Sequence, residues 1–107
     1  MEKLAYEFTA TAPVTRAVRV GVVASGDLEV LLSPAQQLQV SIQITTAVNG
    51  KKATWDALLT RMFSDTPRPA AHIEINDNGA TPGVVKLRLE QAFEQAIDTR
   101  PHEPTSY

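Results

Sequence analysis

Alternating apolar and polar residues fill the first half of the chain and predict β-strands. Residues 3–9 follow the period of two that places every second side chain on one buried face. Residues 17–23 are rich in β-branched side chains, and residues 28–32 follow after a short connection at 24–27. Two strands joined by so short a connection predict a hairpin.

The middle of the chain adds a strand, a helix and another strand. Residues 38–45 alternate most strictly, and an Asn-Gly pair ends this strand. Trp55 opens a run of apolar residues spaced at i, i+3, i+4, i+7 and i+8 that extends to Phe63, the stripe of an amphipathic helix. After two prolines, residues 71–75 alternate again and predict a short strand.

A second helix is predicted towards the end of the chain. Thr81 has the residue type of an N-cap, Pro82 suits the first helical position, and apolar residues recur on one face up to Ile97. Residues 85–89 also alternate as a strand would, but the helical register continues beyond them, which favours the helix. Residues 99–107 offer little to bury, and we expect a mobile tail there.

These elements predict an α+β fold with a mainly antiparallel sheet of four to five strands and two helices on one face. Strand 38–45, the first helix and strand 71–75 would form a crossover that places a parallel pair inside the sheet. Because no internal repeat or long linker divides the chain, we expect a single domain over residues 1–98.

Composition excludes several classes of protein. The 107 residues are 43% hydrophobic and 21% charged, as is ordinary for a soluble globular domain. A net charge of −2 lacks the basic excess of a nucleic-acid binder. Without cysteine the chain cannot form disulfides or thiolate metal sites. No signal peptide or long apolar run is visible, so we expect a cytoplasmic protein with neither a membrane nor a nucleic acid as partner.

Familiar catalytic and cofactor-binding motifs are missing. His72 stands alone on the polar face of its strand and His102 lies in the tail, so neither belongs to a helical metal-binding pair. Ser25 is not inside a G-x-S-x-G elbow. Gly21 and Gly26 precede a strand instead of the helix that a phosphate-binding loop requires. We therefore expect no catalytic and no metal-ligating residue.

Three other features have ordinary structural explanations. Residues 77–79 (DNG) resemble part of a calcium loop but lack its remaining oxygen ligands, which favours a turn with a helix cap. Trp55 is expected in the core rather than as an anchor for a partner. Lys86 and Arg88 could attract an anionic partner, but on an exposed helix flank we expect both side chains to be solvated.

Ser25 has the setting that most suggests chemistry. At the tip of a hairpin, beside Gly26 and Asp27, its hydroxyl would be accessible on a rigid support. Serine without a paired base is a weak nucleophile, so Ser25 is better suited to accept a covalent group from another enzyme than to catalyse a reaction. The alternative is that all three are simply good turn residues.

Three blocks of sequence carry a family resemblance: residues 22–32 (VVASGDLEVLL), 46–50 (TAVNG) and 77–91 (DNGATPGVVKLRLEQ). With these blocks the chain resembles, from Leu4 to about Asp98, the acyl carrier (delta) subunit of malonate decarboxylase. A shorter match, Ser-Gly-Asp after a strand and Gly-Ala before the last helix, is similar to the acyl carrier (gamma) chain of citrate lyase.

The resemblance implies a carrier subunit without catalytic activity. Its Ser25 would hold phosphoribosyl-dephospho-coenzyme A through a phosphodiester bond, and acetyl and malonyl groups would form thioesters with the thiol of that group. Gly26 and Asp27 would support the turn, with Asp27 accepting backbone hydrogen bonds. The implied partners are the acyltransferase subunit and the decarboxylase subunits of malonate decarboxylase, a prosthetic-group transferase and a malonyl-loading enzyme.

The chain departs from the acyl carriers of fatty-acid synthesis, which are helical bundles with the serine at a helix N-terminus. We therefore expect that a common phosphopantetheinyl transferase does not modify Ser25. Two alternatives remain open. The chain could be an unmodified structural or adaptor subunit, or a small hydrolase, which would need a base near Ser25 that the sequence does not place there.

Overall fold

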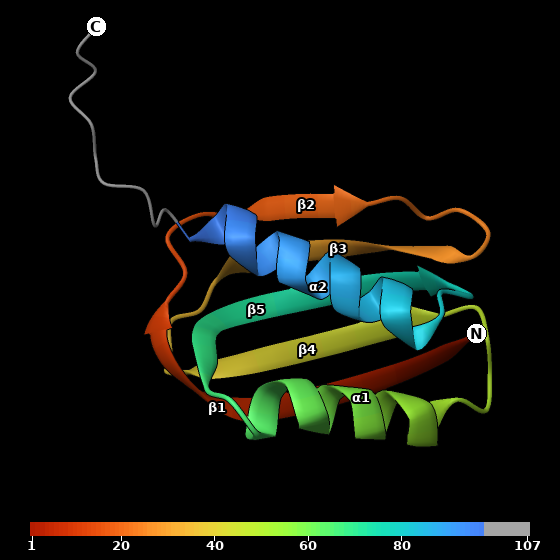
Figure 1. Cartoon of the computed structure of the whole chain (residues 1–107), viewed down its shortest axis with the longest axis horizontal. Coiled ribbons are helices and arrows are strands. Elements are labelled where there is room, and N and C mark those ends of the chain that lie inside the picture. The colour runs from red at the N-terminus through yellow and green to blue at the C-terminus, as the bar shows by residue number, and fades with distance from the viewer. Residues whose placement is uncertain (98–107) are drawn as a thin grey trace, which may run out of the picture.

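The computed structural model describes residues 1–97, which form a five-stranded sheet and two helices (Figure 1). In chain order the elements are β1 (Glu2–Pro13), β2 (Val18–Gly21), β3 (Asp27–Pro34), β4 (Gln39–Thr46), α1 (Lys52–Ser64), β5 (Arg68–Asn78) and α2 (Pro82–Ala96). Every predicted strand and helix is present, and the α+β prediction is confirmed. The predicted mobile tail at 99–107, with His102, lies outside the described residues.

The sheet has the strand order β1-β4-β5-β3-β2, which the sequence left open. Neighbouring strands are antiparallel except β4 and β5, which run parallel and are joined through α1. This is the crossover expected from the sequence, since parallel neighbours need a long connection. Near its start β5 also pairs with the end of β1, where Ala10 lies opposite Arg68.

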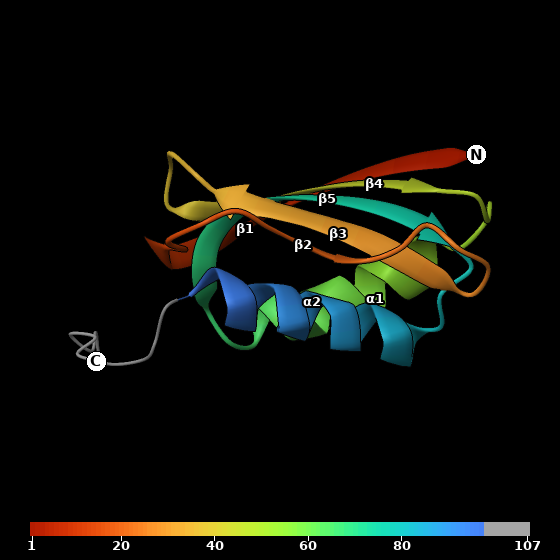
Figure 2. The same ribbon diagram turned by 90° about the horizontal axis from the view of Figure 1, so that it is seen from above.

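Both helices cover the same face of the sheet, as Figure 2 shows from the side. Alternate residues of β4 point towards them, and Val40, Ile42 and Ile44 are buried there. The helices contribute Leu59 and Leu89, which are completely buried. Other large members of this single core are Leu28, Val30, Leu32, Trp55, Met62, Phe63, Ile73, Ile75 and Phe93.

Strand boundaries differ from the sequence prediction in several places. β1 extends to Pro13 and β5 to Asn78, beyond the predicted ranges 3–9 and 71–75. β2 ends at Gly21, so Val22 and Val23 are loop residues with exposed side chains. β4 begins after Leu38, which is also exposed. β5 begins at Arg68, earlier than predicted, because the end of β1 supplies a pairing partner that local sequence does not reveal.

The start of α2 is as predicted. The hydroxyl of Thr81 accepts a hydrogen bond from the N–H of Val84 at 3.3 Å, and Pro82 is the first helical residue. Val85 is buried while Leu87 is exposed, the helical pattern and not the strand alternative. Within residues 1–97, neither helix has the length and apolarity needed to cross a membrane.

Candidate functional site

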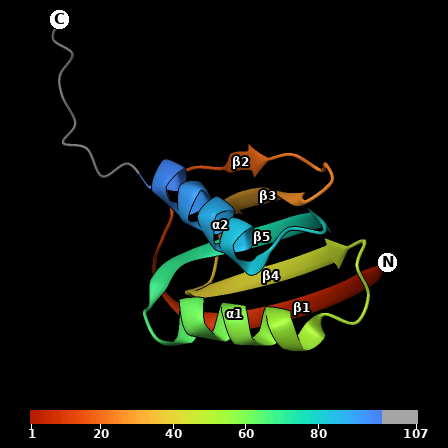
Figure 3. The same cartoon turned by 45° about the vertical axis from the view of Figure 1, so that its right-hand side comes forward.

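Three connections meet at one end of the molecule: β2–β3 (residues 22–26), β4–α1 (residues 47–51) and β5–α2 (residues 79–81) (Figures 1 and 3). We call these three connections the loop end. The N–H of Gly26 donates a hydrogen bond to the carbonyl of Asn78 at 2.8 Å. The segment that carries Ser25 is therefore fixed directly against the connection that leads into α2.

Ser25 occupies a tight turn in the first of these connections. The N–H of Asp27 donates to the carbonyl of Ala24 at 2.9 Å, which closes a four-residue turn with Ser25 and Gly26 at its centre. Gly26 has φ +76°, a left-handed conformation that glycine adopts at little cost. Ser25 is exposed, so the accessible setting predicted for its hydroxyl agrees with the structure.

An ion pair between Asp27 and Arg88 connects the Ser25 turn to α2. Asp27 accepts from Arg88 Nη2 at 2.8 Å and Arg88 Nε at 3.1 Å, and from the N–H of Leu28 at 2.7 Å. The prediction that Arg88 is solvated is wrong, because α2 packs over β3 and β2 and carries the guanidinium to the first residue of β3. Asp27 accepts one backbone hydrogen bond as predicted, but Arg88 is its main partner.

These hydrogen bonds also set the charge states of the pair. Those from Arg88, followed by the one from Leu28, lower the pKa of Asp27 below its usual value of 3.8. Asp27 in turn raises the pKa of Arg88. Both groups are therefore charged at neutral pH, and the Asp27 carboxylate is committed to this pair rather than free to accept a proton from Ser25.

Gly21 makes the approach of β2, β3 and α2 possible. It has φ +79°, and a Cβ built on it would lie 2.1 Å from the carbonyl oxygen of Leu28 and 3.3 Å from Arg88 Nε. A side chain at this position would thus collide with the backbone of β3. This role of Gly21 was not predicted, because the backbone that a side chain would meet belongs to a residue of another strand, Leu28.

A buried polar pair fixes the second and third connections to each other. Thr46 and Asp77 lie opposite one another at the ends of parallel strands β4 and β5. The Thr46 hydroxyl donates to Asp77 Oδ2 at 2.8 Å, and Asp77 also accepts from the N–H groups of Gly79 at 3.3 Å and Ala80 at 3.0 Å. Asp77 caps the turn as an acceptor, but the turn begins later than the predicted 77–79, because β5 continues to Asn78. The role of Thr46 was not predicted.

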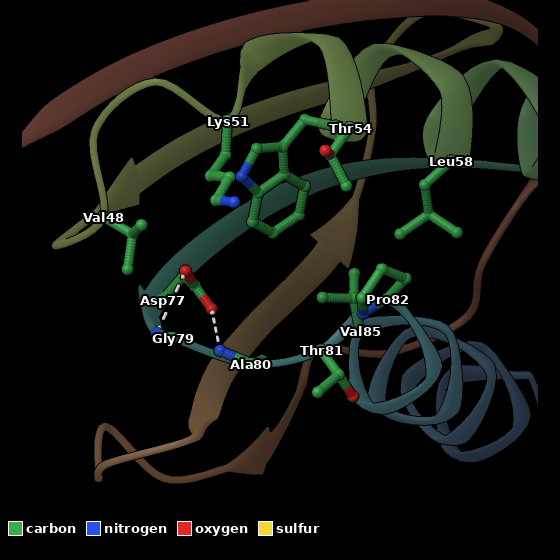
Figure 4. Close-up of a pocket in the computed structure, with 11 residues that line it drawn as sticks. Val48, Lys51, Thr54, Leu58, Asp77, Gly79, Ala80, Thr81, Pro82 and Val85 are labelled. Atoms are coloured by element: carbon green, nitrogen blue, oxygen red, sulfur yellow. Dashed lines mark hydrogen bonds between the residues drawn. The ribbon is translucent and has the colours of Figure 1, made fainter.

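A cavity of about 430 Å³ opens between the start of α1 and the start of α2 (Figure 4). Its walls are largely apolar and include Val48, Trp55, Leu58, Pro82 and Val85. The remaining walls come from Lys51, Thr54, Asp77 and the 79–81 connection. Trp55 is 5% exposed and belongs to the core as predicted, but it also lines this cavity.

Within residues 1–97, the histidine His72 lies away from Ser25. His72 pairs with Ser33, far along β5 from the Asn78 end, and its nearest charged partner is Glu74 at 3.8 Å. Among residues 1–97, no group of three or more His, Asp or Glu side chains is arranged to hold a metal ion. A Cβ built on the neighbouring Gly26 meets no atom within 4 Å, so no other segment packs against that side of the turn.

Lys86 has the exposed position predicted for it on α2. The structural roles of Gly21, Thr46 and Arg88 were not predicted from the sequence, because each depends on a contact between distant segments. A glycine that interrupts a run of β-branched residues was the one local signal for Gly21.

Known proteins resemble this chain along most of its length. Residues 15–96 match the family described as "Malonate decarboxylase delta subunit (MdcD)". The malonate decarboxylase acyl carrier protein of Stutzerimonas stutzeri is 53% identical over 89% of this chain and 96% of its own length. The protein of the same name from Pseudomonas syringae is 55% identical over the same shares of the two chains.

A solved structure agrees in fold as well as in sequence. One chain in the crystal structure of a Pseudomonas malonate decarboxylase hetero-tetramer in complex with malonate superposes with a TM-score of 0.86. It is 52% identical and covers 90% of this chain and 99% of its own length. The chain described here therefore belongs to the malonate decarboxylase delta-subunit family, the family of its acyl carrier proteins.

Proposed function

We propose that this chain is the acyl carrier subunit of a malonate decarboxylase and that Ser25 holds its prosthetic group, phosphoribosyl-dephospho-coenzyme A. The observation that carries the proposal is the exposed Ser25 hydroxyl at the tip of a turn fixed on two sides, by Asn78 and by the Asp27–Arg88 pair. Family membership supports the carrier role. Because the chain has no cysteine, any thiol for acyl transfer must come from an attached group.

When bound, the prosthetic group supplies a thiol on which acetyl and malonyl groups are held as thioesters, whose carbonyl can accept the electrons released by loss of carbon dioxide. The chain itself would hold the prosthetic group at the surface and fix the position of its attachment point. Ser25 provides the ester oxygen, and Gly26 gives the turn its left-handed bend. The Asp27–Arg88 pair keeps the turn in place without offering Ser25 a base.

The proposed partners are the acyltransferase and decarboxylase subunits, with a dedicated prosthetic-group transferase and a malonyl-loading enzyme acting on the carrier. A flexible tether raises the concentration of its end group near each partner to about the millimolar range. A small domain with one exposed attachment point is sufficient for this task. The similar chain in the Pseudomonas hetero-tetramer supports assembly with other subunits.

The direct test is the intact mass of the protein purified from its native host. We expect an added mass on the wild type that is absent from a Ser25→Ala variant. Ser64→Ala is the matched control, because Ser64 is also exposed but ends α1, away from the loop end. An unmodified polypeptide in all three samples would contradict the proposal and favour the adaptor alternative.

A second test concerns the enzyme that modifies Ser25. Ser25 lies between two antiparallel strands, whereas common phosphopantetheinyl transferases act on serines at helix N-termini. We expect no added phosphopantetheine when such a transferase and coenzyme A are incubated with the purified chain, while a helical-bundle carrier is modified in the same assay. Efficient loading of Ser25 would contradict this expectation.

A further inference from the structure

The cavity between α1 and α2 adjoins the segment that carries Ser25. The 79–81 connection forms one wall of the cavity, and the preceding residue, Asn78, is hydrogen-bonded to Gly26. A Cβ built on Gly79 would lie 3.9 Å from the backbone nitrogen of Gly26 and 3.9 Å from the side chain of Val48. The turn that carries Ser25 and the cavity are therefore separated only by the chain segment that leads from Asn78 into the 79–81 connection.

The size and the largely apolar lining of the cavity fit a small ring system. Its volume of about 430 Å³ is within the range of about 300–1,000 Å³ typical of small-molecule sites. Apolar side chains dominate its walls, and the hydroxyl of Thr54 and the amine of Lys51 are polar groups among them (Figure 4). The Asp77 carboxylate at its base is already occupied by hydrogen bonds from Thr46, Gly79 and Ala80.

Lys51 adds a positive charge at this site. It is exposed and forms no ion pair with any other residue between 1 and 97, unlike its neighbour Lys52, which pairs with Asp56 at 2.9 Å. A phosphate that lies outside the apolar part of the cavity would find this amine as its counter-charge. The cavity thus combines an apolar interior with a cation suited to a nucleotide.

We propose that this cavity binds the adenine nucleoside of the arm attached to Ser25, with Lys51 facing the phosphates of the arm. This inference rests on the proposed function. Along such an arm the order from the serine is phosphate, ribose, adenosine, diphosphate, pantetheine and thiol, so adenine is the first large ring that could reach the cavity. Holding the nucleoside there leaves the thiol end free to visit the partner subunits.

Trp55 gives a direct readout, because it is the only tryptophan of the chain and lines the cavity. The Ser25→Ala variant, which carries no arm, is titrated separately with dephospho-coenzyme A, adenosine 5′-phosphate and pantetheine. Tryptophan emission is excited at the red edge of indole absorption, where adenine absorbs little. We expect saturable changes with both adenine compounds in the millimolar range and none with pantetheine. Equal responses to all three, or no response to any, would overturn the proposal.

Paired variants locate the binding site. Thr54→Phe fills the cavity, whereas Thr60→Phe places the same ring on an exposed position of α1 outside it. We expect Thr54→Phe to weaken dephospho-coenzyme A binding at least tenfold, roughly the effect of blocking one good contact, and Thr60→Phe to leave it unchanged. Lys51→Ala should weaken binding of the phosphate-containing compounds, with Lys86→Ala as its control. Equal binding by all four variants would overturn the assignment.

The attached arm provides the last test, with outcomes that separate the two proposals. In native protein with the added mass on Ser25, we expect altered Trp55 emission and shifted amide resonances at Thr54, Gly79 and Ala80 compared with Ser25→Ala. Added mass without these changes contradicts the cavity assignment alone. No added mass contradicts the proposed function, whatever the result of the titration.

Discussion

Gly21 and Gly50 share a left-handed backbone but differ in their surroundings. Their φ angles are +79° and +80°, yet a Cβ would meet the Leu28 carbonyl oxygen at 2.1 Å in the first case and no atom within 4 Å in the second. Gly50→Ala should therefore lose about 1–2 kcal/mol of unfolding free energy from backbone strain. Gly21→Ala should lose more, because β2 must also move away from β3. Urea unfolding measures both, and equal losses would contradict the role given to Gly21.

The Asp27–Arg88 pair makes the Ser25 turn sensitive to acid. The folded-state pKa of Asp27 lies below its unfolded value of 3.8. The pair therefore contributes its full stabilisation at pH values above 3.8 and loses it as the pH falls through the lower, folded-state pKa. Arg88→Gln should raise the pKa of Asp27 towards 3.8, as measured by the carboxyl carbon resonance during a pH titration. Lys86→Gln is the control. An unchanged Asp27 pKa in Arg88→Gln would show that Arg88 does not stabilise the carboxylate.

Between elements, one buried hydroxyl links the ends of β4 and β5. Thr46 donates to Asp77 and accepts from the N–H of Val48 at 3.0 Å, so Thr46→Val removes a donor and leaves that N–H without its partner. We expect a loss of about 1–3 kcal/mol in unfolding free energy. Thr45→Val is the control, since Thr45 points to the other face of the sheet, and it should change stability by less than about 0.5 kcal/mol. Similar losses in both variants would contradict this role.

Elements that follow from local periodicity were predictable, and contacts between elements were not. The alternation around Ile42 and the stripe around Leu59 each describe one face of one element, and both positions are buried as expected. The end of β2 was misplaced because Val22 and Val23 have strand propensity but no pairing partner in β3. The Arg88 contact depends on how α2 crosses the sheet, which no local pattern encodes.

The same limit applied to the candidate site. Ser25 was identifiable because turn residues between two strands place a hydroxyl at a surface. The cavity was not identifiable, because its walls come from β4–α1 and β5–α2 segments that meet only after the parallel pair has formed. Trp55 was correctly assigned to the core, but the periodicity of α1 does not reveal that the core opens beside it.

Across the whole molecule, the connection that carries Ser25 and the β3–β4 connection lie at opposite ends. β3 begins and β4 ends at the loop end, together with the starts of both helices, whereas the β3–β4 connection lies at the opposite end (Figures 1 and 2). Each end exposes large apolar side chains: Val23 is 59% exposed at the loop end, and Leu38 is 65% exposed at the other. If Ser25 carries the prosthetic group as proposed, the enzyme that attaches it would dock at the loop end, where Val23 is exposed, and not at the end where Leu38 is exposed.

Because Val23 and Leu38 are similarly exposed at opposite ends of the molecule, substitutions at these two residues can be compared directly. Val23 lies two residues from Ser25, and burying a valine side chain against a partner contributes about 1.5 kcal/mol, so Val23→Ser should slow transfer of the prosthetic group by about tenfold. Leu38→Ser removes a similarly exposed side chain at the far end and should leave the rate unchanged. The measurement is the rate of mass addition to Ser25 by the dedicated transferase at limiting carrier concentration. Both side chains are already exposed to water, so neither substitution should lower the unfolding free energy by more than about 0.5 kcal/mol. A slower rate in Val23→Ser would then reflect docking rather than unfolding, and equal slowing by Leu38→Ser would contradict recognition through the loop end.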